Sequence, residues 1–368
     1  MSDLAEREPM LRENLPEFPL VSIIISNYNY KNYLEGAIGS ALNQTYSDVE
    51  VIVVDDGSTD GSRQLIASYG DRIVVVLKEN GGQASACNAG YRVSQGEVVI
   101  FLDADDMLLP DAVERVIAGF RSRPGVAKVQ YRLRIIDANG RPTGELTPPA
   151  RLRMHSGDLR QHLIDVNGYV WPSTSGNAFA AAVLRQIMPI PEALCRGMPD
   201  IHLCNLSPVF GEVVTLEEPA GLYRVHGRNN YYDPTGSVDL DKLRMILLAN
   251  EDNHMRKKAL FSALYSVDTH TIGPRDMYSL RGRMISLKLD PKKHPFKDSL
   301  WKLFVRGCLL SVSYPDPLTS KRRKFLYLLF FCTMFLSPRF LARLTARTLF
   351  SEQRGWLYDK IVSILGRT

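Results

Sequence analysis

Short apolar runs alternate with helical patterns along the N-terminal part of this chain. The apolar runs are rich in β-branched residues, and polar residues stop each one: Val21–Ser26, Val49–Val54, Ile73–Leu77 and Val98–Leu102. The helical patterns lie between them, at Tyr33–Leu42, Gly61–Tyr69 and from Gly82 to Val93. This alternation is typical of βαβ units, and the right-handed crossover rule then predicts a doubly wound α/β fold.

The pattern changes further along the chain. Residues 141–167 are rich in Pro and Arg and poorly periodic, which predicts a loop or lid. Past Leu240 the pattern becomes helical, and no strand is expected after about Met245. A chain of 368 residues exceeds the usual size of one hydrophobic core. We therefore expect a tail at residues 1–18, an α/β domain at 19–240 and a helical region at 241–368.

Charge is divided unevenly between these regions. Residues 255–368 hold 22 Lys and Arg against 7 Asp and Glu, whereas residues 1–254 hold 23 against 33. A basic C-terminal region on an acidic body indicates an anionic partner for that region. The five cysteines stand singly without a Cys-x-x-Cys pair, which argues against zinc and redox motifs and suits a reducing cytoplasm. The acidic N-terminus shows no apolar segment of the kind that a secretory signal needs.

The basic region contains an apolar stretch that is too short to cross a bilayer. Residues 325–336 follow Lys321–Lys324, and a spanning helix needs about 20 apolar residues. Arg339, Arg343 and Arg347 then recur every four residues between Phe and Leu, as in a helix that lies on a membrane surface. We expect residues 321–350 to contact an anionic membrane from its cytoplasmic face. The alternative is a helical subdomain with its own core. Nucleic acid is not expected, because bulky apolar residues separate the charges.

The best candidate for chemistry is the acidic end of the fourth apolar run. Asp103, Asp105 and Asp106 follow a run that is typical of a strand buried on both faces. Crowded carboxylates repel one another unless a cation lies between them, and Asp-x-Asp supplies the oxygen ligands that Mg²⁺ or Mn²⁺ prefers. The alternative is that Asp105 or Asp106 caps a helix opened by Pro110.

Three further polar clusters follow strands of the predicted sheet: Ser26–Asn29, Asp55–Ser58 and Gly81–Gln83. Parallel strands would bring all of them to the edge that holds the acidic cluster. There Tyr28 is suited to stacking on a base, Asp56 to accepting from a base N–H, and Gly82 to close approach of the backbone to a phosphate. Neither a Walker A lysine nor a Gly-x-Gly-x-x-Gly turn is found. The combination predicts a nucleotide diphosphate site.

The order and spacing of these segments resemble those of the inverting glycosyltransferases of family 2. The resemblance covers about residues 19–230 and is carried by four motifs: Val21–Asn29, Val53–Asp60, Asn80–Gly82 with Asn88-Ala89-Gly90, and Phe101–Asp106. It implies a GT-A fold with a doubly wound mixed sheet, a nucleotide-sugar donor that is most often a UDP-sugar, and a divalent cation, Mn²⁺ or Mg²⁺.

The resemblance also implies roles for individual residues. Ser26, Tyr28 and Asp56 would contact the base and ribose of the donor. Asp103 would lie near the ribose, and Asp105 would bind the metal.

Two later segments resemble the rest of the family's site. Met198–Leu203 is similar to the segment that holds the aspartate base, which makes Asp200 the candidate catalytic residue. Tyr223–Asn229 is similar to the segment whose Arg and His lie near the diphosphate, here Arg224 and His226. From the residues alone, Trp171 is a candidate platform for a donor or acceptor sugar.

The chain departs from the family pattern at three places. Cys87 stands where many members carry Arg, and Pro199 stands where a Glu frequently precedes the base. The Gln-x-x-Arg-Trp signature of processive members is absent, because residues 353–356 have the wrong spacing. We therefore expect the transfer of one sugar per encounter.

These observations together predict a metal-dependent, inverting glycosyltransferase associated with the inner face of the membrane. Its acceptor would be a saccharide or a lipid-linked saccharide in surface glycan synthesis. The alternative is a non-catalytic subunit that binds nucleotide sugars within a glycan assembly complex. A nucleotidyltransferase is disfavoured, because the segment after the first strand, Ser26–Tyr30, is not basic.

Overall fold

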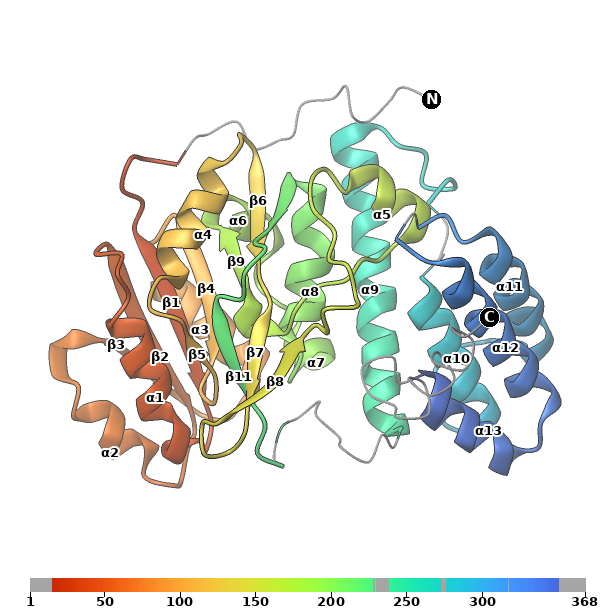
Figure 1. The fold of residues 1–368 in the computed structure, drawn as a ribbon, viewed down its shortest axis with the longest axis horizontal. Helices are drawn as coiled ribbons and strands as arrows, with labels where there is room; N and C mark the ends of the chain where they lie inside the picture. The colour runs from red at the N-terminus through yellow and green to blue at the C-terminus, as the bar shows by residue number, and fades with distance from the viewer. Residues whose placement is uncertain (1–14, 228, 230–237, 273–275, 317, 351–368) are drawn as a thin grey trace. The chain divides into compact units, whose positions relative to one another are not determined.

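The chain folds into two compact units (Figure 1). The computed structural model describes residues 15–227, 229, 238–272, 276–316 and 318–350. The first unit comprises residues 1–161 and 169–230, and the second comprises residues 162–168 and 231–368. The domain boundaries expected from the sequence, at residues 18 and 240, remain predictions, and most of the N-terminal tail lies outside the described residues.

A seven-stranded mixed sheet forms the centre of the first unit, in the order β10-β6-β9-β4-β1-β2-β3. Its strands are β1 (Val21–Asn27), β2 (Val49–Asp56), β3 (Val74–Lys78), β4 (Val98–Asp103), β6 (Val126–Gln130), β9 (Asn177–Ala180) and β10 (Glu212–Thr215). Only β9 runs antiparallel to its neighbours in this sheet. The predicted α/β fold class, a doubly wound mixed sheet of GT-A type followed by a basic helical region, is confirmed.

A smaller sheet with the order β5-β11-β7-β8 lies in the same unit. Its strands are β5 (Met107–Leu108), β7 (Leu133–Ile136), β8 (Pro142–Thr147) and β11 (Gly221–Arg224). The predicted loop or lid at residues 141–167 was wrong in part, because β8 pairs there with β7 and the helix α5 (Arg160–Val166) follows. Hydrogen bonding to β7 stabilises β8, whose polar and exposed residues show no apolar periodicity.

Seven helices accompany the two sheets in the described part of the first unit: α1 (Lys31–Leu42), α2 (Ser62–Ala67), α3 (Gln83–Val93), α4 (Ala112–Arg121), α6 (Ala181–Ile187), α7 (Glu192–Cys195) and α8 (Pro199–Leu206). The face predicted for α1 is the buried one, with Leu34, Ala37, Ile38 and Ala41. Helix α3 packs on β1 and β2, where a Cβ atom at Gly90 would come within 2.3 Å of Ile24. Glycine at that position therefore permits the close approach of helix and sheet.

The register of the parallel strands aligns the polar clusters. Ser26 of β1 pairs with Asp103 of β4, and Asn27 pairs with Asp55 of β2. Because these strands are parallel, their carboxyl ends share one edge of the sheet. The expectation that the clusters meet at that edge is confirmed.

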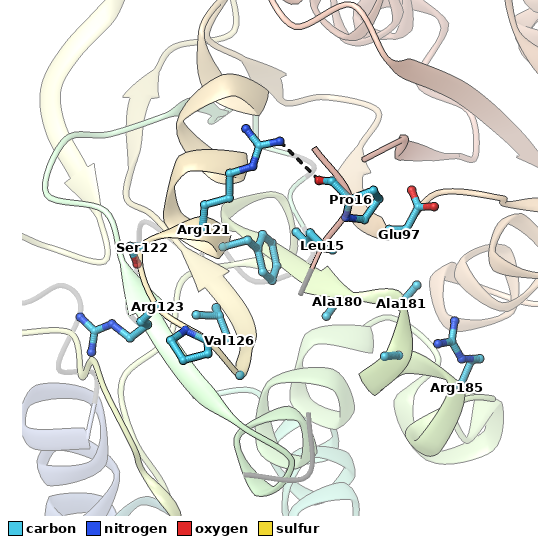
Figure 2. A pocket seen from close by; sticks show the side chains of 14 residues that line it. Leu15, Pro16, Glu97, Arg121, Ser122, Arg123, Val126, Ala180, Ala181 and Arg185 are labelled. Carbon is cyan, nitrogen blue, oxygen red and sulfur yellow. Dashed lines mark hydrogen bonds between the residues drawn. The ribbon is translucent and has the colours of Figure 1, made fainter. Parts of the chain in front are cut away.

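A pocket lies at the other edge of the sheet (Figure 2). It is lined by residues next to the amino ends of β4 and β6, including Glu97, Arg121 and Val126. Arg121 donates a hydrogen bond to the carbonyl oxygen of Pro16 at 3.4 Å. None of the residues proposed for the nucleotide site lines this pocket, which therefore lies apart from the predicted chemistry.

The second unit is helical over its described residues. Its helices are α9 (Leu240–Tyr265), α10 (Met277–Leu289), α11 (Leu300–Ser313), α12 (Lys321–Leu336) and α13 (Arg339–Thr345). Side chains of Asp239, Asp276 and Ser320 accept hydrogen bonds from backbone N–H groups at the starts of α9, α10 and α12. These caps define where the three helices begin.

The apolar stretch of α12 belongs to the core of the second unit. Phe330, Phe331 and Met334 are fully buried and pack in one cluster with residues of α9, α10 and α11. The alternative of a helical subdomain with its own core thus describes the buried face of α12, whereas Phe325 and Leu336 at its two ends are exposed. None of the described helices combines the length and apolar character needed to span a membrane.

Candidate active site

Three carboxylates converge after β4. Asp103, Asp105 and Asp106 each contribute one carboxylate oxygen, and these three oxygens lie within 4.8 Å of one another. The hydroxyl of Ser175 donates to Asp106 Oδ2 at 2.7 Å and accepts from the backbone N–H of Asp103 at 3.1 Å. The backbone N–H of Arg224 donates to Asp106 Oδ1 at 3.0 Å. These bonds hold the cluster in place but bring no positive charge to Asp106.

The crowding changes the acidity of the cluster. Burial, then the charges of Asp105 and Asp200, raises the pKa of Asp103 well above its usual range. Burial, then the charges of Asp105 and Asp103, does the same for Asp106. A divalent cation between the three carboxylates would relieve this repulsion. Because the oxygen donors and their spacing suit Mg²⁺ or Mn²⁺, the residues fit the expected cofactor.

The helix-cap alternative for Asp105 and Asp106 was wrong. Helix α4 begins at Ala112 with Asp111 in the cap position. Asp106 instead accepts hydrogen bonds from Ser175 and Arg224.

His226 lies directly against the candidate metal ligand. Its Nε2 atom is 2.9 Å from Asp105 Oδ2, and its side chain is only 1% exposed. The ring stacks on Tyr33 with a centroid distance of 4.7 Å, and its backbone N–H donates to Asn229 Oδ1 at 2.9 Å. The structure thus brings His226 to the carboxylate cluster. Its predicted contact with a diphosphate stays a prediction.

Arg224 is buried and binds backbone atoms near the cluster. Its Nε donates to the carbonyl oxygen of Asp105 at 3.0 Å, and its Nη1 lies 3.4 Å from the carbonyl oxygens of Asp137 and Ala138. The guanidinium also lies over the ring of Tyr33. These contacts position the segment that carries Asp105, and the predicted contact of Arg224 with the donor remains untested.

Asp56, at the end of β2, has a full set of hydrogen-bond donors. Its Oδ1 accepts from Lys78 Nζ at 2.6 Å and from the N–H of Gly81 at 2.9 Å. Its Oδ2 accepts from Asn80 Nδ2 at 3.1 Å and from the N–H of Gly82 at 2.7 Å. Both oxygens are therefore engaged in holding the loop of residues 78–82, and a base N–H would have to share them.

This loop also depends on Gly82 and Arg196. Gly82 has φ +91°, and a Cβ atom there would lie 2.7 Å from the carbonyl oxygen of Arg196. Arg196 in turn donates to Asn80 Oδ1 at 2.6 Å and to the carbonyl oxygen of Gly81 at 3.0 Å. Glycine is required at position 82 because the left-handed backbone and the close contact both exclude a side chain.

Ser26 and Tyr28 lie at the end of β1. Ser26 is partly exposed beside Asp103, and Tyr28 is 46% exposed. An exposed aromatic ring at this edge is compatible with stacking on a base. Their donor contacts remain predictions.

Asp200, the candidate base, stands in the first turn of α8. Burial raises its pKa to about 6, against the opposing effects of backbone N–H groups, the Trp171 side chain and Lys128. A carboxylate with that pKa is ionised at neutral pH and accepts a proton more readily than an exposed aspartate. Its charge acts on Asp103, so the candidate base and the metal cluster belong to one site.

Trp171 has a different surrounding from the one expected. Its ring packs against Tyr169 with a centroid distance of 5.2 Å, and its side chain favours the charged form of Asp200, which lowers the pKa of that carboxyl against the effect of burial. The predicted role as a sugar platform is untested.

Sequence reasoning missed two residues that organise the site: Ser175 connects Asp103 with Asp106, and Lys78 pairs with Asp56. Gln83 belongs to a predicted polar cluster but had no role assigned, and its Nε2 donates to Asp103 Oδ1 at 2.5 Å. Ser175 carried no signal in the sequence, because its partner Asp106 is 69 positions away in the chain.

Comparison with protein families identifies part of the chain. Residues 22–175 match the model described as Glycosyl transferase family 2. The match covers less than half of the chain. The match begins in β1, includes the acidic cluster and ends at Ser175, whereas Asp200, Arg224 and His226 lie beyond it.

Several proteins similar to this chain carry the name of a glycosyltransferase or a polysaccharide synthase. An uncharacterized glycosyltransferase of Nostoc sp. is 39% identical over 217 residues, which cover 57% of this chain and 66% of that protein. One from Rickettsia typhi is 50% identical over 27% of this chain and 31% of its own length. Chondroitin synthase of Pasteurella multocida is 36% identical over 48% of this chain and 16% of its own length. The chain thus spans less than two thirds of each of these relatives.

Solved structures with some likeness to this chain include S. aureus TarS and a mannosyltransferase. A crystal structure of S. aureus TarS residues 1–349 with UDP-GlcNAc has a TM-score of 0.49 at 16% identity, with 90% of each chain covered. Mannosyltransferase PcManGT from Pyrobaculum calidifontis, in complex with GDP-Man and Mn²⁺, has a TM-score of 0.47 at 15% identity, with 90% and 91% covered.

Proposed function

We propose that this protein is an inverting glycosyltransferase that transfers a single sugar from a nucleotide-sugar donor, preferably a UDP-sugar. The acceptor is a hydroxyl group of a saccharide or lipid-linked saccharide in surface glycan synthesis. The observation that carries the proposal is the meeting of a carboxylate cluster with a partly buried base, Asp200, at the carboxyl edge of a family 2 domain. Ser26, Tyr28, Asp56 and Gly82 lie at the same edge and would hold the donor.

Inversion requires a base on the face of the sugar opposite the leaving diphosphate. The acceptor oxygen forms a bond to the anomeric carbon while the bond from that carbon to the phosphate oxygen breaks. The electron pair leaves with the diphosphate, and Asp200 takes the acceptor proton. Trp171 and Lys128 favour the charged form of the Asp200 carboxylate, against the effect of burial. A positioned base contributes about 10²–10⁴-fold to such a reaction.

Asp105 would hold a divalent cation, Mn²⁺ or Mg²⁺, with Asp103 and Asp106 close by. When bound, the cation stabilises the negative charge that develops on the diphosphate. His226 and Arg224 orient Asp105 through its carboxylate and its carbonyl oxygen. These contacts fix the candidate ligand before donor binding.

Replacement of the base tests this proposal. We expect Asp200→Asn to lower kcat by about 10²-fold or more while the KM for the donor changes little. The assay measures transfer and nucleotide release with UDP-, GDP- and dTDP-sugars, with Mn²⁺ and with EDTA. In the wild type, kcat/KM should fall as the pH drops through about 6, because protonation removes the base.

The exposed Asp111 provides the matched control, since Asp111→Asn removes a carboxylate without touching the site. Full activity of Asp200→Asn would contradict the assigned base. Metal-dependent donor binding without turnover, for all donors and acceptors, would favour the non-catalytic subunit instead.

We also propose that the second unit contacts an anionic membrane surface at its cytoplasmic face. The support comes from α13, where Phe340 and Leu344 are 70% and 55% exposed and Arg339 and Arg343 are exposed beside them. Apolar side chains between arginines suit the interface between headgroups and acyl chains. Compared with the expectation from sequence, the contact is reduced from residues 321–350 to the region of α13.

Sedimentation with phosphatidylglycerol vesicles tests the membrane contact. We expect the double substitution Phe340→Ser and Leu344→Ser to weaken vesicle binding about tenfold, since apolar burial is lost. Leu309→Ser with Val312→Ser is the control, because these residues of α11 are equally exposed. Absence of binding by the wild type, or equal loss in both variants, would contradict the proposal.

A further inference from the structure

Lys128 is a charged residue inside the central sheet. It lies in β6, is fully buried, and has its Nζ atom 5.2 Å and 5.8 Å from the ring centroids of Tyr169 and Phe179. Burial of an ammonium group is costly unless its charge is compensated. A lysine is therefore unexpected at this buried position of β6, which an apolar residue such as Val or Ile could occupy without burying a charge.

The Nζ atom of Lys128 donates to three neutral acceptors. They are Gln130 Oε1 at 3.0 Å, the hydroxyl oxygen of Tyr169 at 3.0 Å and Cys204 Sγ at 3.2 Å. A neutral amine has two N–H donors, whereas an ammonium has three. Three acceptors around one nitrogen thus match the charged form.

The protons of these acceptors point elsewhere. The Gln130 amide group donates to the carbonyl oxygen of His155, the Tyr169 hydroxyl donates to the carbonyl oxygen of Cys204 at 2.9 Å, and the Cys204 thiol donates toward Asn177. Each acceptor is consequently oriented with a lone pair toward Lys128. Burial lowers the pKa of Lys128, and the acceptors around its Nζ atom oppose this effect by stabilising the ammonium.

The charge of Lys128 acts on the candidate base. Cys204, which accepts from Lys128, lies four positions after Asp200 on α8 and therefore on the same side of that helix. Asp200 is the carboxylate whose charge stabilises the ammonium, within the part of the chain that the structure describes. The ammonium in turn opposes the effect of burial on Asp200.

We propose that Lys128 is a positioning residue for Asp200: its buried ammonium keeps the Asp200 carboxylate ionised, and its bond to Cys204 anchors α8 one turn after Asp200. This inference rests on the proposed role of Asp200 as the catalytic base. It assigns a reason to the buried charge, since an apolar residue in β6 would remove the favourable effect of Lys128 on the Asp200 carboxylate.

The other groups around Asp200 cannot replace this effect. Trp171 is neutral, and burial raises the pKa of Cys204 to about 12 and that of Cys87 well above its usual range, so both thiols are uncharged. Asp103 carries charge of the same sign as Asp200. Lys128 is thus the cation that acts on Asp200 from the described residues packed around it.

The pH profile of transfer tests the inference. Lys128→Met removes the charge while retaining an unbranched side chain of similar length. We expect the acidic limb of kcat/KM, near pH 6 in the wild type, to move upward by about one pH unit, because loss of a nearby cation favours the protonated acid. The buried Lys257 supplies the control, since it acts on Asp276 rather than on Asp200. Lys257→Met should leave the limb in place.

A titration without turnover separates this inference from the proposed function. The chain has three tryptophans, so Trp301→Phe with Trp356→Phe leaves Trp171 as the single fluorophore beside Asp200. Its emission should change near pH 6, lose this transition in Asp200→Asn and show it about one unit higher in Lys128→Met. If the wild type transferred no sugar with any donor, the proposed function would fail while this titration still decided the role of Lys128.

A second variant covers the case in which Lys128→Met does not fold. Gln130→Glu keeps Lys128 and places a carboxylate against its Nζ atom, which weakens the field of the ammonium at Asp200. We expect the same upward direction in both the kinetic and the fluorescence titration. An unchanged transition in a folded Lys128→Met protein, or in Gln130→Glu where Lys128→Met is unfolded, would overturn the inference.

Discussion

Asp56 and Asp106 are both buried aspartates at the carboxyl edge of one sheet, yet their surroundings differ. Asp56, 2% exposed, receives a Lys78 ammonium and three N–H donors. Asp106, 1% exposed, receives one hydroxyl and one backbone N–H, and two further carboxylates lie beside it. Lys78 compensates the charge of Asp56. The hydrogen-bond donors of Asp106 are neutral, and we propose that a bound cation compensates its charge.

We infer from these surroundings that Asp56 and the cluster after β4 have different functions. Asp56 builds the loop of residues 78–82, so its contribution is present before any ligand arrives. The cluster of Asp103, Asp105 and Asp106 carries repulsion that a cation would remove, so its contribution appears on binding. The following changes test that division.

The largest effect is expected for Asp105→Asn. Loss of one carboxylate charge should abolish tight Mn²⁺ binding and lower kcat/KM by about 10³-fold, since the developing charge on the diphosphate is no longer stabilised. Calorimetry with Mn²⁺ and the transfer assay measure the two effects. Retention of metal-dependent activity would remove the proposed function of the cluster.

An intermediate effect on stability is expected for Asp56→Asn. The substitution leaves Lys78 without its partner, and we expect the free energy of unfolding to fall by about 2 kcal/mol. Urea unfolding measures this value, and Mn²⁺ binding should persist because the cluster is intact. A loss of metal binding without a loss of stability would reverse the roles assigned to the two sites.

The smallest effect is expected for Asp106→Asn. Because the pKa of Asp106 is raised in the folded state, the folded wild type binds its proton more tightly than the unfolded chain does. Wild-type stability from this group is therefore lost as the pH rises through that raised pKa. Without metal, Asp106→Asn should be as stable as the wild type at about pH 4 and increasingly more stable above it. Thermal unfolding over this pH range would show the opposite trend if Ser175 and Arg224 compensated the charge.

Much of the first unit could be predicted from local patterns. The apolar face of α1 follows the 3.6-residue period of a helix, and the continuous apolar, β-branched runs of β1, β2 and β4 are typical of strands buried on both faces. Strand β8 could not be predicted in this way, because its polar residues are ordered by hydrogen bonds to β7. The surroundings of the apolar stretch of α12 could not be predicted from the sequence either. A membrane surface and a buried helical core both favour apolar side chains in such a pattern.

The sequence by itself determined that Asp56 and the cluster after β4 would meet at one edge, because parallel strands bring their carboxyl ends together. It also determined which residue types were available there for a cation and a phosphate. Only the tertiary structure decided which carboxylate is neutralised, because charge compensation depends on neighbours that are distant in the chain. The backbone N–H of Arg224 reaches Asp106 across 118 positions, and Lys128 of β6 acts on Asp200 of α8 across 72 positions. No local period encodes such contacts, since burial and Coulomb interactions depend on distance in space.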